Sequence, residues 1–297
     1  MMHKESDRHV WHLGTQPQQR TGLTDVRLNP GEPISSEQHN SYLLNTSFLQ
    51  EAVRNPPFKD LQSRCGMFQL MISATSSTDA GSTQRFAQDI RRQLDDVLSA
   101  LRRFADRTSH ALSQRYGKDS RQREIFKQAL SDEFDNQFAY RLCWHLRNYS
   151  DHLGDPISRV KGRIHFFDDP DVYSGLQLEP YFDSTQLLEN YQWKRVLQKD
   201  LRQINGEFPA STVVDALQSS CKRAHSKALL AQETSIMAAV DAIFELANEA
   251  TTDTGLRPML ILVQSEKSGL QIPQPIQVEL ADEAVKAIQE ARSFLAP

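Results

Sequence analysis

The stretch TQRFAQDIRRQLDDVLSALRRFADRTSHALSQRY, residues 83–116, decides the fold class of this chain. Its large apolar side chains recur at steps of three and four residues: Phe86, Ile90, Leu94, Val97, Leu101 and Phe104. This spacing places them on one face of an α-helix. Gly117 follows, and glycine readily takes the left-handed conformation that ends many helices. The sequence therefore predicts one long helix over residues 83–116.

A second run of helical spacing extends from about residue 120 to 149, with an expected break at Ser131–Asp132, and Gly154-Asp155-Pro156 ends it. Because only residues 117–119 join the two runs, we expect an antiparallel helical hairpin. Two further helical segments are expected, over residues 184–204 and 209–250. Together these segments predict a mainly α protein built around an antiparallel helical bundle.

The punctuation of the chain by Gly, Pro and polar residues predicts three regions. Residues 1–80 are expected to form an N-terminal region, with an irregular arm over 1–34 that has no role in the core. The helical bundle is expected over residues 81–250, with an insertion at 155–183. Residues 251–297 are expected to form a small α+β appendage of a β-hairpin and a helix.

Shorter elements are predicted inside these regions. Helices are expected over residues 35–53 and 282–294, and strands over 67–73, 163–167, 259–263 and 276–280.

The composition excludes several classes of protein. The 297 residues include 39% hydrophobic and 24% charged residues, with 12 Gly and 13 Pro, which is unlike collagen-like, mucin-like or wholly disordered chains. The formal net charge of -4 means that any affinity for nucleic acid must come from a local basic surface. No apolar run approaches the length of a membrane span, and the N-terminus lacks the apolar core of a secretory signal. We therefore expect a cytoplasmic protein.

Three cysteines are widely spaced along the chain, at positions 65, 143 and 221, without any CxxC pair. We interpret them as buried small hydrophobic residues. The histidines of the first forty residues lack carboxylates or cysteines at the spacings of a metal site, so no metal and no cofactor is expected.

Chemistry is carried by the stretch YRLCWHLRNYSDHLG, residues 140–154, which holds Arg147, Asn148 and His152 at the end of a predicted helix. The spacing of Arg147 and His152, and the run Leu-Arg-Asn-Tyr within it, resemble the R-x4-6-H signature of the HEPN superfamily. These are all-helical domains of prokaryotic defence and toxin systems, many of which are metal-independent endoribonucleases. The resemblance covers at most residues 83–250.

The resemblance implies a site and partners. Arg147, His152 and Asn148 would be catalytic, and Tyr149 and His145 would lie at the bound RNA. It also implies a homodimer whose two Arg/His pairs face a shared cleft, products with 2′,3′-cyclic phosphate and 5′-hydroxyl ends, and an antitoxin or defence-system protein as a partner.

The residue types suit this chemistry. RNA cleavage without a metal needs a base for the ribose 2′-hydroxyl, a positive group for the phosphate and an acid for the leaving oxygen. Histidine exchanges protons near neutral pH, and arginine offers a charged planar fork to phosphate oxygens. On a continuous helix, however, residues five apart project about 140° from each other. Arg147 and His152 can therefore converge only if the helix ends or bends near His152.

Other interpretations remain open from the sequence alone. Arg147 and Asp151 have the spacing of an ion pair on a helix surface, and a histidine in a last turn interacts favourably with the helix C-terminus. His145 and Tyr149 are also compatible with simple packing. A non-catalytic HEPN-like module that binds RNA or protein, and a helical scaffold, are the alternatives. Residues 85–127 carry eleven basic against six acidic side chains, which indicates either an RNA-attracting face or a solvated face with ion pairs.

Overall fold

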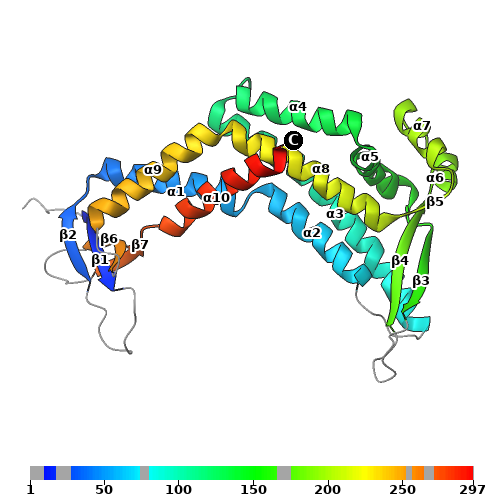
Figure 1. Ribbon diagram of the computed structural model, residues 1–297, viewed down its shortest axis with the longest axis horizontal. Coiled ribbons are helices and arrows are strands. Elements are labelled where there is room, and N and C mark those ends of the chain that lie inside the picture. Colours follow the sequence, from blue (N-terminus) through cyan, green and yellow to red (C-terminus); the bar gives the residue numbers. More distant parts are fainter. Residues whose placement is uncertain are drawn as a thin grey trace, which may run out of the picture. The chain divides into compact units, whose positions relative to one another are not determined.

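The computed structural model describes residues 10–17, 28–73, 80–165, 175–251, 256–263 and 271–296. Within these ranges the chain is mainly helical, with two small antiparallel sheets (Figure 1). It divides into two compact units. The first unit consists of residues up to Asn55 together with Gln232–Ala296, and the second unit consists of Pro56–Ala231. These boundaries differ from the expected ones at residues 80 and 250, because the two ends of the chain pair with each other.

The second unit contains a bundle of helices and a three-stranded sheet. Its elements are α2 (Pro57–Ser73), α3 (Ala80–Tyr116), α4 (Arg121–Asn136), α5 (Phe138–Leu153), β3 (Arg159–His165), β4 (Gly175–Asp183), α6 (Ser184–Asn190), α7 (Arg195–Ile204), β5 (Glu207–Pro209) and α8 (Ala210–Ala231).

The predicted long helix is confirmed as α3, and it stops where expected, at Gly117 with φ of 94°. Ser120 caps α4 by accepting a hydrogen bond from the backbone N–H of Arg123. The interruption of the next helical run lies at Gln137, which has extended backbone, so its expected place at residues 131–132 was wrong. The Ser-Asp pair there faces outward on a continuing helix, where Asp132 accepts hydrogen bonds from Gln128 and Lys227.

Helix α2 corrects the strand that was expected over residues 67–73. Its buried side chains are spaced by three and four residues from the first turn onward: Phe58, Leu61, Cys65, Phe68 and Ile72. Pro57 stands at the first helical position, where its missing N–H costs nothing. The apolar run MFQLMI has high strand propensity when taken alone, but it is the last part of this longer helical pattern.

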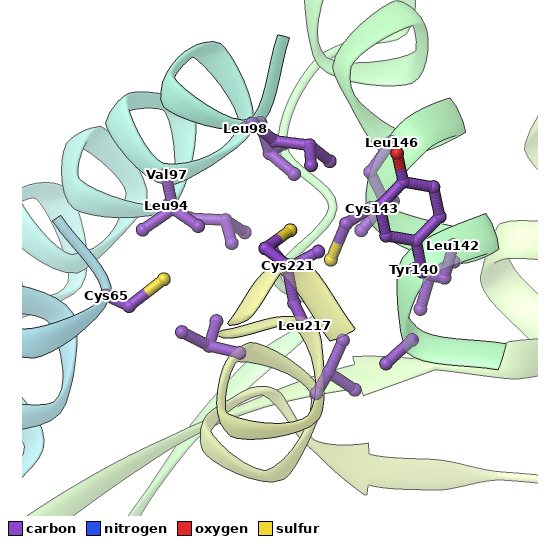
Figure 2. Close-up of a cluster of buried hydrophobic side chains, with 14 of the residues drawn as sticks. Cys65, Leu94, Val97, Leu98, Tyr140, Leu142, Cys143, Leu146, Leu217 and Cys221 are labelled. Atoms are coloured by element: carbon purple, nitrogen blue, oxygen red, sulfur yellow. The ribbon is translucent and has the colours of Figure 1, made fainter. Parts of the chain in front are cut away.

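The core of the second unit lies between α2, α3, α5 and α8. Figure 2 shows Cys65 of α2, Leu94 and Leu98 of α3, Leu146 of α5 and Cys221 of α8 around one interior. All five are at most 1% exposed. Burying a side chain of this size stabilises a fold by about 1.5 to 3 kcal/mol, so this interior accounts for the close packing of the four helices.

The segment expected as an insertion is integrated into this core. Strands β3, β4 and β5 form an antiparallel sheet in the order β3-β4-β5, with Arg159 paired to Tyr181 and Phe182 paired to Phe208. Leu178 and Phe182 of β4 are at most 2% exposed and pack with the helices. The expected strand at residues 163–167 corresponds to β3, except that residues 166 and 167 lie outside the described ranges.

The first unit joins both ends of the chain. Its elements are β1 (Val10–Pro17), β2 (Asn29–Pro33), α1 (Ser36–Leu49), the π-helix η1 (Gln50–Arg54), α9 (Glu233–Ala250), β6 (Leu256–Val263), β7 (Gln271–Pro275) and α10 (Val278–Leu295). The sheet order is β2-β1-β6-β7. The helix expected over residues 35–53 is confirmed, and so is the strand at 259–263.

Two expectations about this unit were wrong. The arm has a role in the core: β1 pairs with β6 from Val10 to Pro17, and Leu13 is buried. Its partner strand lies more than 200 residues away, so no local window of sequence reveals the pairing. The second strand of the hairpin ends at Pro275 and not at Leu280, because residues 278–280 already belong to α10. None of the helices described in either unit is long and apolar enough to cross a membrane.

Candidate functional site

Helix α5, which carries the Arg147–His152 motif, is fixed at its start by Arg141. Arg141 donates from Nε and Nη2 to Oδ2 of Asp200 on α7, at 3.0 and 2.8 Å. Its Nη1 donates to the carbonyl oxygens of Phe134 and Asp135 at the end of α4, both at 2.7 Å. A buried arginine is tolerated only when its donors are satisfied in this way. The motif helix is therefore attached to both α4 and α7.

The two faces of α5 differ sharply. Leu142, Cys143, Leu146 and Tyr149 are at most 3% exposed and pack into the core of the second unit. On the opposite side, Asn148 and His152 are exposed and Arg147 is half-buried. The predicted catalytic residues therefore lie on the solvent side of the helix, and none of them is inside the core.

Arg147 and His152 do not converge within one chain. Helix α5 includes His152 and ends at Leu153, and Gly154 follows with φ of 114°. The turn thus comes after His152, and the two side chains leave the helix about 140° apart. Asn148 lies between them on the exposed face. The alternative ion pair of Arg147 with Asp151 cannot be described, because the side chain of Asp151 lies outside the described residues.

Tyr149 is part of the packing on the other side. Its ring stacks on Trp193 at 5.7 Å between centroids and meets Tyr191 edge-on at 5.9 Å. Its hydroxyl accepts a hydrogen bond from Nδ2 of Asn190 at 3.4 Å. The structure therefore places Tyr149 on the packed side of α5, apart from Asn148 and His152.

His145 is half-buried and lies edge-on to the ring of Phe134, at 5.8 Å between centroids. Its Nε2 atom is buried, with no hydrogen-bond partner among the described residues. Burial lowers the pKa of His145, and the positive charges of Lys194 and Arg102 lower it further. His145 is therefore held in its neutral form, beside two cations.

Arg102 of α3 is a candidate that the sequence did not single out. Its Nη2 donates to the carbonyl oxygen of Trp144 on α5 at 2.9 Å, and its Cζ lies 3.5 Å from the centroid of the Trp144 ring. Burial lowers the pKa of Arg102, and the nearby charge of Arg147 acts in the same direction. Arg102 stood only as one of many basic residues in 85–127, and Lys194 had no signal at all, because both reach α5 through the tertiary fold.

The other basic residues of 85–127 are largely engaged in ion pairs. Arg103 meets Asp60 of α2 at 2.9 Å, and Arg91 pairs with Asp155. Two further pairs lie along the helices themselves, Arg92 with Asp89 and Lys127 with Glu124. This pattern agrees with a solvated face that carries ion pairs for most of the stretch, with Arg102 as the exception of interest.

The three cysteines are buried as expected and are free thiols. Burial raises the pKa of Cys65 to about 12, and it also raises the pKa values of Cys143 and Cys221. Only the thiolate is nucleophilic, so these side chains serve as packing groups between α2, α5 and α8 (Figure 2).

Across the described ranges, no group of three or more His, Cys, Asp or Glu side chains is arranged to hold a metal ion. Comparison of the chain with protein-family models, with curated proteins and with solved structures finds no match to any of them. The function must therefore be argued from the geometry of α5 and its surroundings.

Proposed function

We propose that this protein is a metal-independent endoribonuclease of the HEPN type, similar to those of bacterial defence and toxin systems. The observation that carries the proposal is the placement of Arg147, Asn148 and His152 on the solvent side of one anchored helix. A motif that only stabilised the fold would be expected to make its contacts inside the unit. Here the core contacts of α5 are made instead by the neighbouring Leu142, Leu146 and Tyr149.

The reaction is a transfer within the RNA chain. A histidine takes the proton from a ribose 2′-hydroxyl, and the 2′-oxygen forms a bond to the adjacent phosphorus. The bond from phosphorus to the 5′-oxygen breaks, and that oxygen receives a proton from an acid. The products are a 2′,3′-cyclic phosphate and a 5′-hydroxyl, and no water is consumed. Arg147 would stabilise the negative charge that gathers on the phosphate.

The geometry of α5 also supports a homodimer. The reaction needs both a base and an acid, whereas the motif supplies one histidine per chain. Arg147 and His152 of the same chain point about 140° apart, so one phosphate is unlikely to be reached by both from a single helix. A cleft between two copies would bring two motif histidines and two arginines to one phosphate.

The experiment is an RNA cleavage assay in excess EDTA with the purified full-length protein. We expect cleavage of a mixed-sequence RNA, with 2′,3′-cyclic phosphate and 5′-hydroxyl ends, because no step needs a metal. The same strand with 2′-deoxyribose throughout is the control, and it should remain intact because it lacks the attacking oxygen. Cleavage that stops with EDTA, or that also occurs in the deoxy strand, would contradict the proposal. Binding of RNA without cleavage would favour a non-catalytic RNA-binding module.

A further inference from the structure

Four side chains of the second unit form a group that we call the cationic cluster: Arg102 of α3, His145 and Arg147 of α5, and Lys194, which directly precedes α7. Arg102 and Arg147 are close enough for each charge to act on the other, and Lys194 and Arg102 both act on His145. Lys194 is exposed, and the other three side chains are half-buried. The cluster is therefore open to solvent.

Arg102 is held in place at the centre of this cluster. The hydrogen bond to the Trp144 carbonyl and the stacking of its guanidinium on the Trp144 ring fix its position on α5. Neither contact neutralises its charge, because a carbonyl and an aromatic ring are both uncharged. Asp106, one turn along α3, acts on Arg102 more weakly than burial and Arg147 do.

The contrast with the other anchored arginines of the unit is informative. Arg141 meets Asp200, Arg223 meets Glu133 at 2.6 Å, and Arg103 meets Asp60. Each of these arginines faces a carboxylate, whereas Arg102 faces a second arginine. Like charges held together in a partly desolvated place are unfavourable until an anion binds between them.

We propose that the cationic cluster is a subsite for the phosphate groups of a nucleic-acid strand, with Arg102 and Lys194 as binding residues that the Arg147–His152 motif does not include. The choice of a nucleic-acid strand as the ligand rests on the proposed function. Arginine offers a fork to phosphate oxygens, and Lys194 adds a point charge at the edge. The side chain of Trp144, already stacked on Arg102, adds an aromatic surface of the kind on which bases stack.

The test uses a fluorescently labelled single strand of 2′-deoxyribose, which cannot be cleaved through a 2′-oxygen, so that binding is measured apart from chemistry. Fluorescence anisotropy gives its Kd at several salt concentrations. We expect Lys194→Gln and Arg102→Gln each to weaken binding about three- to tenfold and to reduce the slope of log K against log salt by about 0.7, the value for one lost contact to a single strand. Arg202→Gln, an exposed change on the last turn of α7, is the matched control and should leave both quantities unchanged.

A second readout locates the bound strand. An anion beside His145 favours its protonated form, so the pKa of the assigned His145 ring proton, followed by NMR, should rise when the strand binds. Lys194 and Arg102 are the charged groups that act on this ring, and α4 contributes the uncharged ring of Phe134. Inorganic phosphate alone is a separate arm, and a rise with phosphate at the same sites shows that the cluster recognises the phosphate group itself.

The outcomes separate this inference from the proposed function. If Lys194→Gln and Arg102→Gln bind the deoxy strand as the unchanged protein does, and the titration of His145 does not move, the subsite is refuted even if RNA is cleaved. If RNA is never cleaved but the strand binds through these residues, the ribonuclease proposal fails and the subsite stands. Because Arg102→Gln also removes a contact to Trp144, its thermal melt is recorded, and the exposed Lys194→Glu provides a second test with a larger expected loss.

Discussion

His225 on α8 is a histidine that the fold keeps neutral. Its ring stacks on Phe58 of α2, at 4.9 Å between centroids and an interplanar angle of 16°. Burial lowers the pKa of His225 to about 4, and the charge of Lys59 acts in the same direction. The unfolded chain has no such environment, so its histidine takes up a proton near pH 6.5. Between these two values the unfolded state binds a proton that the folded state does not.

This difference makes stability depend on pH, with a definite sign. The contribution of neutral His225 is complete above about pH 6.5 and is lost as the pH falls toward about 4, by at most about 3 kcal/mol. We expect His225→Gln, which cannot titrate, to lose less stability on acidification than the unchanged protein. Urea unfolding of both proteins at intervals from pH 7 to 4.5 measures this. Parallel curves of unfolding free energy against pH would contradict the assignment.

At the scale of elements, the position of α5 depends on a charged contact in a poorly solvated place. The side chains of Arg141 and Asp200 are 8% and 20% exposed, and they join α5 to α7. Arg64 and Asp96 form a comparable pair between α2 and α3, but these side chains are 42% and 49% exposed. Exposed ion pairs contribute little because water solvates the separated charges, whereas a buried arginine that loses its carboxylate stays desolvated and unpaired.

We therefore expect Asp200→Ala to lower the free energy of unfolding by about 3 kcal/mol. Asp96→Ala is the matched control and should cost less than about 1 kcal/mol. Chemical denaturation of the two variants decides between them. Equal losses would show that the Arg141 contact does not anchor the motif helix.

The elements also show what the sequence can reveal. Helix α3 could be predicted because its face of Phe86, Leu94 and Phe104 repeats over many turns, so local spacing alone determines the outcome. Residues 67–73 misled because a short apolar run reads equally well as strand or helix. Strand β1 could not be predicted as a core element, because its stability comes from a ladder with β6 at the other end of the chain.

The same limit applies to the candidate site. Arg147, Asn148 and His152 lie within six consecutive residues, so a motif could bring them to notice. Arg102 and Lys194 are each more than forty residues away from Arg147, and only the packing of α3, α5 and α7 brings their charges to it. Their contribution depends on three-dimensional proximity, for which no local pattern exists.

At the scale of the whole molecule, the account requires two copies of the chain. One α5 presents Arg147 and His152 in different directions, and a shared cleft would combine Arg147 of one copy with His152 of the other. Such a site has a property that a single-chain site lacks. Two inactive variants that carry different lesions can restore each other, because a mixed dimer contains one cleft in which both required residues are intact.

The measurement that tests this most directly is RNA cleavage in EDTA by Arg147→Ala, by His152→Ala and by the two variants co-expressed with different affinity tags. We predict that each variant alone cleaves about 10² to 10⁴-fold more slowly than the unchanged protein, as for the loss of an acid–base or phosphate-stabilising group. Co-expression should restore about a quarter of the full rate, because about half of the dimers are mixed and each has one intact cleft. Cleavage by either single variant at the unchanged rate would contradict the central claim.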